Sequence, residues 1–297
     1  MGVKGEGRNR NLPSALAASF AYFFAAEEMG KNTGGAVMLL AIDIGNSSIS
    51  TGLFCLESGE LKYTFKLSSD RERTADEYFA QFGSMLYMSD INKNDIKGAV
   101  ISSVVPTLTH KLEDCAHRLC GQKPKTVGPG LKTGFAIKID NPSELGSDLV
   151  ANTAGVLGLG GKGRAYIIVD MGTATTISAV SESGEYLGNC IMPGVRVSLD
   201  ALHTETAQLP EVTLSTPKRV IGKNSGDSVR SGVVFGNAIM IDGLIDEFEK
   251  EMKLKGGATV YATGGLCEGV IPACRHEMVY QPHLTLYGLY FIYKNNA

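Results

Sequence analysis

The sequence has no excess of charge of either sign. Its 297 residues carry 28 Lys and Arg against 31 Asp and Glu, which leaves a net charge of −3. Nucleic acids and anionic membrane surfaces attract proteins mainly through excess positive charge, so neither is predicted as a partner. A polyanionic ligand would need a local basic site.

Cysteine clusters and long apolar runs are also missing. The six cysteines form no CxxC pair and no Cys/His group at zinc-ligand spacing, so we expect reduced, mostly buried thiols in a cytoplasmic protein. No uninterrupted apolar run of about 18 residues occurs, and no transmembrane helix is predicted. With 43% hydrophobic and 20% charged residues, the chain has the composition of a globular protein.

The length suits two domains of ordinary size. Ahead of them, a basic stretch followed by an apolar segment is typical of a signal peptide. However, Met38–Asp43 forms a strand-like run that marks the start of a folded domain. We therefore interpret residues 1–37 as an extension, disordered or the product of a mis-set start codon, with a signal peptide as the alternative. The predicted domains are 38–160 and 161–297.

One supersecondary unit occurs twice in the chain. Residues 39–54 and 166–178 both contain an apolar strand, an Asp-apolar-Gly step, small hydroxyl or amide residues, and a β-branched second strand. A short turn between two β-rich runs predicts a β-hairpin. The repetition predicts two related domains that face each other, each beginning with such a hairpin.

Strands and helices alternate through the rest of the chain. The helical patterns are 74–89, 108–119, 149–159 and a long helix broken by glycine at 229–255, and the strand patterns are 99–106 and 260–265. This alternation predicts the α/β class.

The repeated turn has the chemistry of a phosphate site. Its glycine allows a phosphate to approach the backbone, its amides and hydroxyls are neutral donors, and its carboxylate can hold a cation. A single such turn is more often an ordinary hairpin. Two in register, together with residues 262–266 where a strand end could meet an adenosine, favour a clamp for a nucleotide. Asp43 and Asp170 each end a buried strand, where a carboxylate without a partner is costly.

Several segments together resemble the motifs of one family. They are Asp43–Ser48, Asn141–Asp148, Asp170–Thr176, Gly188–Gly194, Ile221–Ser225 and Thr263–Gly265. Their order and spacing are similar to those of type III pantothenate kinases, over about residues 38–297. That family belongs to the acetate kinase, sugar kinase, Hsp70 and actin superfamily. The resemblance therefore implies two related ribonuclease H-like domains with an interdomain ATP cleft.

The resemblance also implies a reaction and a set of ligands. The reaction is transfer of the ATP γ-phosphoryl group to the terminal hydroxyl of pantothenate, which gives 4′-phosphopantothenate in the first step of coenzyme A biosynthesis. Enzymes of this type are homodimers that require Mg²⁺ and a monovalent cation, K⁺ or NH₄⁺.

Site residues follow from the resemblance by position. The residues that would wrap the ATP phosphates are Asp43, Ile44, Gly45, Asn46, Ser47, Ser48, Ile49 and Ser50. Thr173 would donate to a phosphate oxygen, and Gly264 and Gly265 would lie against the adenosine. Asp43 would also hold Mg²⁺ through water, and Asp170 the monovalent cation. The pantothenate site would comprise Gly146, Ser147, Asp148, Leu149 and Ser225.

Asp148 would accept the proton of the attacking hydroxyl. Phosphoryl transfer depends on in-line positioning and charge neutralisation, so a carboxylate that orients the hydroxyl and cations at the phosphates suffice. Asp148 also begins a helical pattern, so its alternative role is a carboxylate that stabilises the helix terminus.

Three positions depart from the family pattern. Leu149 replaces Arg, Ile139 replaces Tyr, and Ser225 replaces Thr. Because leucine cannot provide the bidentate contact of arginine, we expect a weak pantothenate site unless another arginine supplies the charge. The candidates for that role are Arg196, Arg219 and Arg230.

Two other functions stay open from the sequence. A catalytically weak homologue could bind ATP and act as a regulatory or partner-binding protein, given Leu149 and Ile139. A sugar or acetate kinase is the third possibility.

Overall fold

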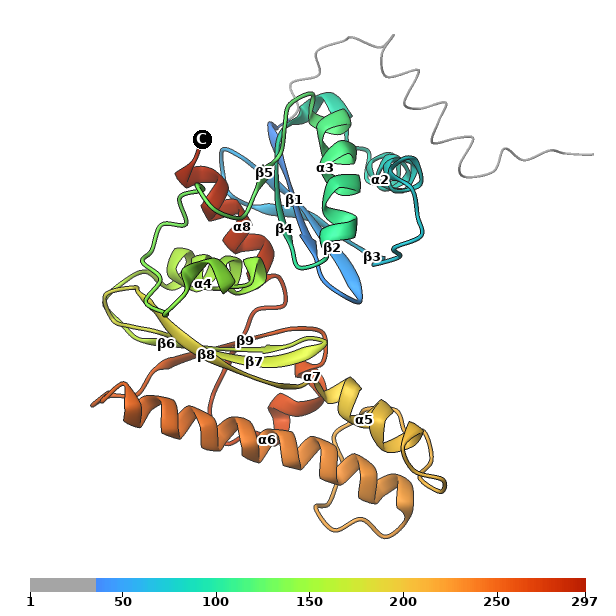
Figure 1. Cartoon of the computed structure of the whole chain (residues 1–297), viewed down its shortest axis with the longest axis vertical. Helices are drawn as coiled ribbons and strands as arrows, with labels where there is room; N and C mark the ends of the chain where they lie inside the picture. The colour runs from blue at the N-terminus through green and yellow to red at the C-terminus, as the bar shows by residue number, and fades with distance from the viewer. Residues whose placement is uncertain (1–35) are drawn as a thin grey trace, which may run out of the picture.

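The computed structural model describes residues 36–297, so the predicted extension lies almost wholly outside the described residues. Within that range the chain forms two five-stranded sheets, with helices between them and outside them (Figure 1). The predicted α/β class is confirmed.

The first sheet has the order β3-β2-β1-β4-β5. Its strands are β1 Met38–Ile44, β2 Ser48–Cys55, β3 Leu61–Ser68, β4 Ile96–Ser103 and β5 Lys125–Thr126. The first two strands form the predicted antiparallel hairpin, and β4 and β5 continue the sheet in parallel. An unbroken run of buried apolar residues covers both faces of β1, as its place at the centre of the sheet requires.

The second sheet repeats this topology strand for strand. Its order is β8-β7-β6-β9-β10, and its strands are β6 Tyr166–Met171, β7 Ala174–Val180, β8 Tyr186–Pro193, β9 Thr259–Thr263 and β10 Val279–Tyr280. Again the first two strands pair antiparallel and the later two add in parallel. The predicted internal repeat is therefore a repeat of whole sheets.

Two helices cover the outer face of the first sheet. They are α2 Ala75–Met88 and α3 Pro106–Cys120, and they share one apolar core with β1 and β4. Thr74 and Glu77 form a capping box that fixes the start of α2, and Pro106 begins α3. These caps explain why both helices lie close to their predicted bounds.

The outer face of the second sheet carries α5 Val195–Thr204, α6 Ser225–Glu251 and α7 Cys267–Val270. The prediction that the long helix is broken by glycine is wrong. Helix α6 runs without interruption from its Asn224 N-cap, whose side chain accepts the Asp227 N–H. Each interior glycine costs roughly 1 kcal/mol, but the buried apolar face of α6 packs on the sheet and holds the helix together.

Helix α6 also has the length and hydropathy of a membrane-spanning helix. Half of its most apolar stretch is buried inside the protein, as in the core helix of a soluble protein, so length and composition alone do not indicate a membrane segment. All six cysteines are free, but only three of them are buried, so the expectation of mostly buried thiols holds for half of them.

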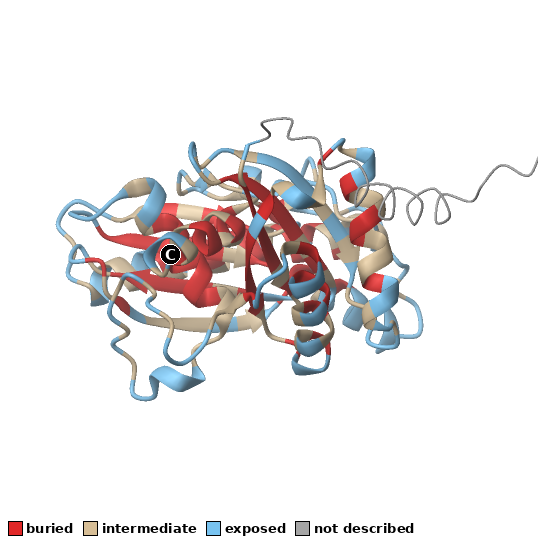
Figure 2. Ribbon diagram, turned by 90° about the horizontal axis from the view of Figure 1, so that it is seen from above, coloured by how far each residue is buried: buried red, intermediate tan, exposed pale blue. Residues whose placement is uncertain are grey.

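The two remaining long helices lie between the sheets (Figure 1). They are α4 Ser147–Gly160 and α8 Leu284–Asn295, and short 3₁₀ helices occur elsewhere at Lys93–Asp95, Pro142–Glu144 and Ile271–Ala273. Buried residues line both helices, and Figure 2 shows that buried positions gather in the interior of the molecule. A Cβ on Gly288 would lie 1.7 Å from the Ala151 carbonyl oxygen, so only glycine allows the two helix backbones to approach this closely.

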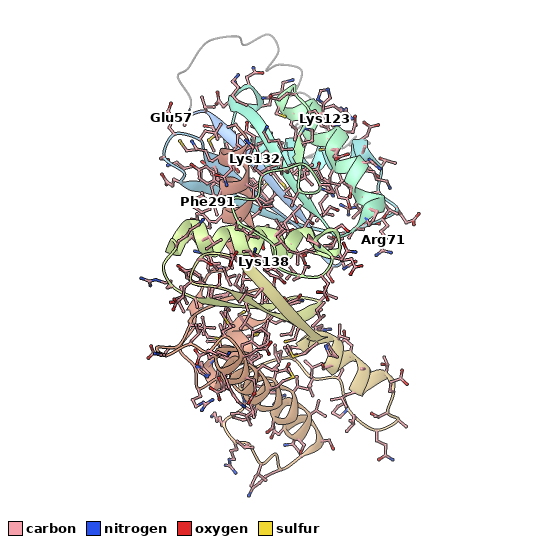
Figure 3. The ribbon with its side chains drawn as sticks, turned by 60° about the vertical axis from the view of Figure 1, so that its left-hand side comes forward. Glu57, Arg71, Lys123, Lys132, Lys138 and Phe291 are labelled. Atoms are coloured by element: carbon pink, nitrogen blue, oxygen red, sulfur yellow. The ribbon has the colours of Figure 1, made fainter. Side chains whose placement is uncertain are left out.

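Helix α8 belongs to the core of the first sheet although it ends the chain. Leu286 and Leu289 pack with Leu39 and Ala41, and Phe291 lies over α4 (Figure 3). The division of the chain at residue 160 stays a prediction, because α8 crosses back to the sheet formed by residues 38–126.

Candidate active site

The first hairpin turn is held from outside by the loop after β3. The Gly45 N–H donates to the Ser48 carbonyl at 3.0 Å and closes the turn. The Ser69 hydroxyl donates to the Gly45 carbonyl at 2.5 Å, and the Ser69 N–H donates to the Ser47 carbonyl. These bonds use backbone groups of the turn and leave Asn46 and Ser47 exposed.

The second turn faces the first one directly. The Ser47 and Thr173 hydroxyl oxygens lie 2.9 Å apart, one from each turn. The sequence predicted two turns that face each other, and this contact confirms it. Neutral donors from both halves of the chain therefore meet at one point, as a phosphate clamp requires.

The glycines at the end of β9 lie beside the second turn. Gly264 has a φ of +102°, and a Cβ there would lie 2.5 Å from the Met171 carbonyl oxygen. Backbone conformation and space thus both require glycine at this position. Gly265 follows, and a Cβ on it would lie 3.8 Å from the Nζ of Lys66 in β3.

Asp43 lies near the end of β1. Its pKa is raised to about 7, first by burial and then by the carboxylates of Asp148 and Asp170, against the opposing effect of the Ser102 hydroxyl. No positive side chain contributes to this shift, so the protein provides no positive charge to balance the charged form of Asp43.

Asp170 occupies the equivalent position near the end of β6. Its pKa is raised to about 6, mainly by burial and also by the Asp148 carboxylate, and a hydrogen bond from Asn152 opposes the rise. The Asn152 amide donates to Asp170 Oδ2 at 2.8 Å and accepts from the Thr285 hydroxyl at 2.7 Å. One chain of hydrogen bonds thus connects β6, α4 and α8.

Asp148 lies in the first turn of α4. Its Oδ1 accepts the Leu149 N–H at 2.9 Å, and burial raises the pKa of the carboxyl despite this bond. A Cβ on Gly146 would lie 2.5 Å from the same Oδ1, so glycine at the N-cap gives the carboxylate room to fold back over the helix start. The helix dipole favours a negative charge here.

Ser147 fixes the helix start to the first sheet. Its hydroxyl donates to the Ser103 carbonyl and accepts both the Ser103 N–H and the Ser102 hydroxyl, at 2.9 to 3.1 Å. The side chain predicted to contact pantothenate is therefore already occupied by bonds that position its neighbour Asp148.

The segment before α4 is fastened to the second sheet. The Lys138 N–H donates to the Tyr186 carbonyl, the Tyr186 N–H donates to the Ala136 carbonyl, and Lys138 Nζ lies 3.3 Å from Glu185 (Figure 3). The loop that leads to Asp148 is thus held by one half of the chain, and the helix start by the other.

Three carboxylates with raised pKa values therefore meet where the two sheets approach α4. Among the described residues, no group of three His, Cys, Asp or Glu side chains has the geometry of a metal site. A cation here would complete its coordination with backbone, water or phosphate oxygens, which suits Mg²⁺ and K⁺. The donor set fits such cations because the shifts of Asp43 and Asp170 include no contribution from a positive partner.

Two of the predicted pantothenate residues do not offer an accessible side chain next to the carboxylates in this chain. Leu149 is only 9% exposed, so its side chain packs inside the protein. Ser225 begins α6, which covers the opposite face of the second sheet from α4 (Figure 1). Of the possible substitute arginines, Arg196 pairs with Asp200 and Arg230 with Asp227.

Sequence reasoning missed two residues that the structure places here, Asn152 bonded to Asp170 and Lys66 beside Gly265. Asn152 stands in the middle of an apolar helix, and a buried amide there was a usable signal because such a group needs partners. Lys66 gave no comparable signal, because an isolated lysine in a strand is usually a solvated surface residue.

A model of the type III pantothenate kinase family matches residues 39–247. The chain belongs to this family. It is 42% identical over 260 residues to the type III pantothenate kinase of Moorella thermoacetica, an alignment that covers 88% of this chain and 100% of that protein. Membership confirms the resemblance, the predicted place in coenzyme A biosynthesis and the enzyme class, an ATP-dependent kinase that acts on an alcohol group.

Two solved structures illustrate the fold of this kinase. The ethanolamine utilization protein EutJ from Carboxydothermus hydrogenoformans is 14% identical, with a TM-score of 0.50 and coverage of 93% of this chain and 98% of that one. MreB 5 of Spiroplasma citri is 8% identical, also with a TM-score of 0.50, over 88% and 97%. At such identities the likeness concerns the fold alone, and it supports the two ribonuclease H-like halves.

The raised pKa of Asp43 predicts a pH dependence of stability for the ligand-free kinase. Between its ordinary pKa of 3.8 and about 7, folded Asp43 keeps a proton that the unfolded chain has released. The free energy of unfolding therefore falls as pH rises through this range. Asp43→Asn should flatten the fall and melt above the wild type at pH 8, by calorimetry without ligands.

The exposed Asp140 provides the control for this experiment. Asp140→Asn should follow the wild-type melting curve at each pH. A melting temperature of Asp43→Asn below that of the wild type at pH 8 would contradict the assigned cost of the buried charge.

The burial of Leu149 changes the expectation for an arginine at this position. Leu149→Arg would lose about 1.5–3 kcal/mol of apolar burial and place a charge among buried groups. We expect a melting temperature several degrees lower and no fall in the pantothenate KM, with Leu149→Met as the volume-matched control. An unchanged melting temperature together with a lower KM would show that residue 149 reaches the acceptor.

Proposed function

We propose that the chain is a pantothenate kinase of the cytoplasm, which transfers the γ-phosphoryl group of ATP to the terminal hydroxyl of pantothenate in the first step of coenzyme A biosynthesis. The observation that carries this proposal is the meeting of three raised-pKa carboxylates beside two facing phosphate-type turns, in a member of this family.

The nucleotide would lie across the two hairpin turns. The residues 43–50 and Thr173 would donate to its phosphates, and Gly264 and Gly265 would leave space for the adenosine. The support is the 2.9 Å contact between Ser47 and Thr173, since it brings donors from both halves within reach of one phosphate. Binding through neutral donors also agrees with the low net charge of the chain.

Asp148 would act on the acceptor hydroxyl. Its raised pKa makes it a better proton acceptor than an ordinary surface carboxylate, and the Leu149 N–H holds one oxygen so that the other can face the substrate. Ser147 and Gly146 would contribute by fixing this orientation.

Asp43 would hold Mg²⁺ through water, and Asp170, oriented by Asn152, would hold K⁺ or NH₄⁺. When bound, these cations neutralise charge on the phosphates. They would also relieve the repulsion among the three carboxylates, which is the reason for expecting them.

Replacement of Asp148 tests the proposed function. Asp148→Asn keeps the shape but removes the proton acceptor, so pantothenate-dependent ADP release should fall by at least about 100-fold while the ATP dissociation constant stays nearly constant. The assay contains Mg²⁺ with K⁺ or NH₄⁺, and Asp140→Asn is the control. A parallel loss of ATP binding would show that Asp148 holds the nucleotide or the fold.

The same assay on the unaltered chain separates the alternatives. ATP binding without pantothenate-dependent ADP release would favour the weak, regulatory homologue. Turnover with sugars or acetate in place of pantothenate would favour the third possibility.

The kinase would act as a homodimer through α6. A groove of about 520 Å³ lies between α5 and α6, on the side of the second sheet away from the carboxylates. Its lining includes Gly232 and Gly236, and a Cβ on either glycine would meet open space. Ile239, 68% exposed, continues the exposed surface of the same helix. Exposed glycines in a helix are costly unless another backbone packs closely against them.

A dimer would also account for Ser225. Because α6 and α4 cover opposite faces of the second sheet, Ser225 would join a pantothenate site only from the second copy.

A leucine in the α6 groove tests the dimer. Gly236→Leu would fill the space that a second helix needs, and overpacking costs about 1–3 kcal/mol, so the dimer dissociation constant should rise roughly 5- to 150-fold in sedimentation experiments. His110→Leu adds the same side chain on the outer surface of α3 and should leave it unchanged. A fully dimeric Gly236→Leu would place the interface elsewhere.

A further inference from the structure

The site holds three carboxylates, yet no positive side chain acts on their pKa values. Burial and hydrogen bonds set the pKa values of Asp43, Asp148 and Asp170, repulsion from other carboxylates adds to those of Asp43 and Asp170, and no Lys or Arg is among the causes. A nucleotide triphosphate brings still more negative charge. Metal cations would offset part of it, but a fixed cation on the protein would also select for the phosphate tail.

Lys66 lies on the face of the first sheet that looks into the site. It pairs with Ser50 across β2 and β3, and Ser50 pairs with Asp43 across β1 and β2. Directly paired residues on neighbouring strands point to the same face of a sheet. The three side chains therefore form one row that starts at the candidate phosphate turn, while Phe65 and Leu67 point to the opposite, apolar core.

The Lys66 side chain reaches across to the second half of the chain. Its Nζ is the atom nearest to the position of a Cβ on Gly265, at 3.8 Å. The Lys66 side chain therefore extends from the sheet that carries Asp43 to Gly265, one of the two glycines proposed to contact the adenosine. A nucleotide that runs from one to the other would pass its ammonium group.

The charge of Lys66 is uncommitted in the ligand-free protein. Across residues 36–297, its Nζ has no carboxylate within 4.0 Å and no hydrogen-bond acceptor. Lys62 of the same strand differs, because its Nζ pairs with Glu60 at 2.5 Å. Arg71 is the neighbouring cation in the loop after β3, and it lies at the periphery of this half (Figure 3).

We propose that Lys66 binds the α- and β-phosphates of the nucleotide and so acts as the protein's own cation in the ATP site. This inference rests on the proposed function, since it assumes that ATP occupies the cleft. A lysine ammonium is a compact charge that contacts phosphate oxygens from several directions, which suits a residue at a bend between phosphate tail and adenosine. It also ties the first sheet to the second through the ligand.

Binding of a series of nucleotides tests this role. Lys66→Met keeps the length of the side chain and removes its charge. The dissociation constants of ATP and ADP should rise by roughly 10- to 150-fold, the value of a charge-assisted hydrogen bond, while adenosine binds as before. The pantothenate KM at saturating ATP should not change.

Two variants serve as controls. Lys62→Met removes a paired lysine of the same strand and should leave all dissociation constants unchanged, and Lys66→Arg should retain most of the affinity for ATP. Melting temperatures show whether each variant folds.

Three results would overturn the inference. Wild-type affinity of Lys66→Met for ATP and ADP would make Lys66 a surface residue, and an equal loss of adenosine binding would make it a residue that only shapes the cleft. If the unaltered chain binds no ATP, both the proposed function and this inference are wrong.

Discussion

The close contact between α4 and α8 determines where everything else in the site lies. Gly288 sits against the Ala151 carbonyl, and Gly155 sits against the Leu284 carbonyl, so neither helix can carry a side chain at the crossing. The pair can therefore fit as one thin layer between two sheets. Because α4 is in this layer, its first turn brings Asp148 to the strand ends, and its second turn brings Asn152 to Asp170. A larger residue at the crossing would separate the carboxylates.

Bringing the carboxylates of Asp43, Asp148 and Asp170 together in a buried site has an electrostatic cost. Burial raises the pKa of all three carboxyls, and neighbouring carboxylates add to the rise at Asp43 and Asp170; the protein offsets these shifts with hydrogen bonds and not with cations. The apolar strands around the carboxylates are a source of this cost, and the packing of the two apolar cores offsets it. The ligand-free site is thus ready to gain stability from whatever positive charge it binds, which explains why a site for a polyanion can be built from acidic residues.

The sequence predicted the parts of the fold that local patterns determine. The two hairpins, the capped helix after Thr74 and the strand before Gly264 follow from alternation, caps and turn glycines. The break predicted in α6 was wrong because glycine lowers helix propensity locally. The packing of the buried face, which keeps the helix continuous, is a tertiary effect that the local pattern does not contain. The burial of Leu149 and the position of the Lys66 ammonium beside Gly265 depend on which elements pack together in three dimensions. The spacing of residues along the chain does not reveal this packing.

The hydrogen bond between Ser47 and Thr173 bears on how the two halves respond to ligand. In the ligand-free chain, two neutral hydroxyls join the turns, a weak and easily exchanged link. On the proposed function, an entering phosphate would accept from both hydroxyls, so the ligand would replace the protein's own bond and connect the two turns. A bound nucleotide would thus link the two halves reversibly. The rigidity of the molecule would then depend on the concentration of the nucleotide in the cell.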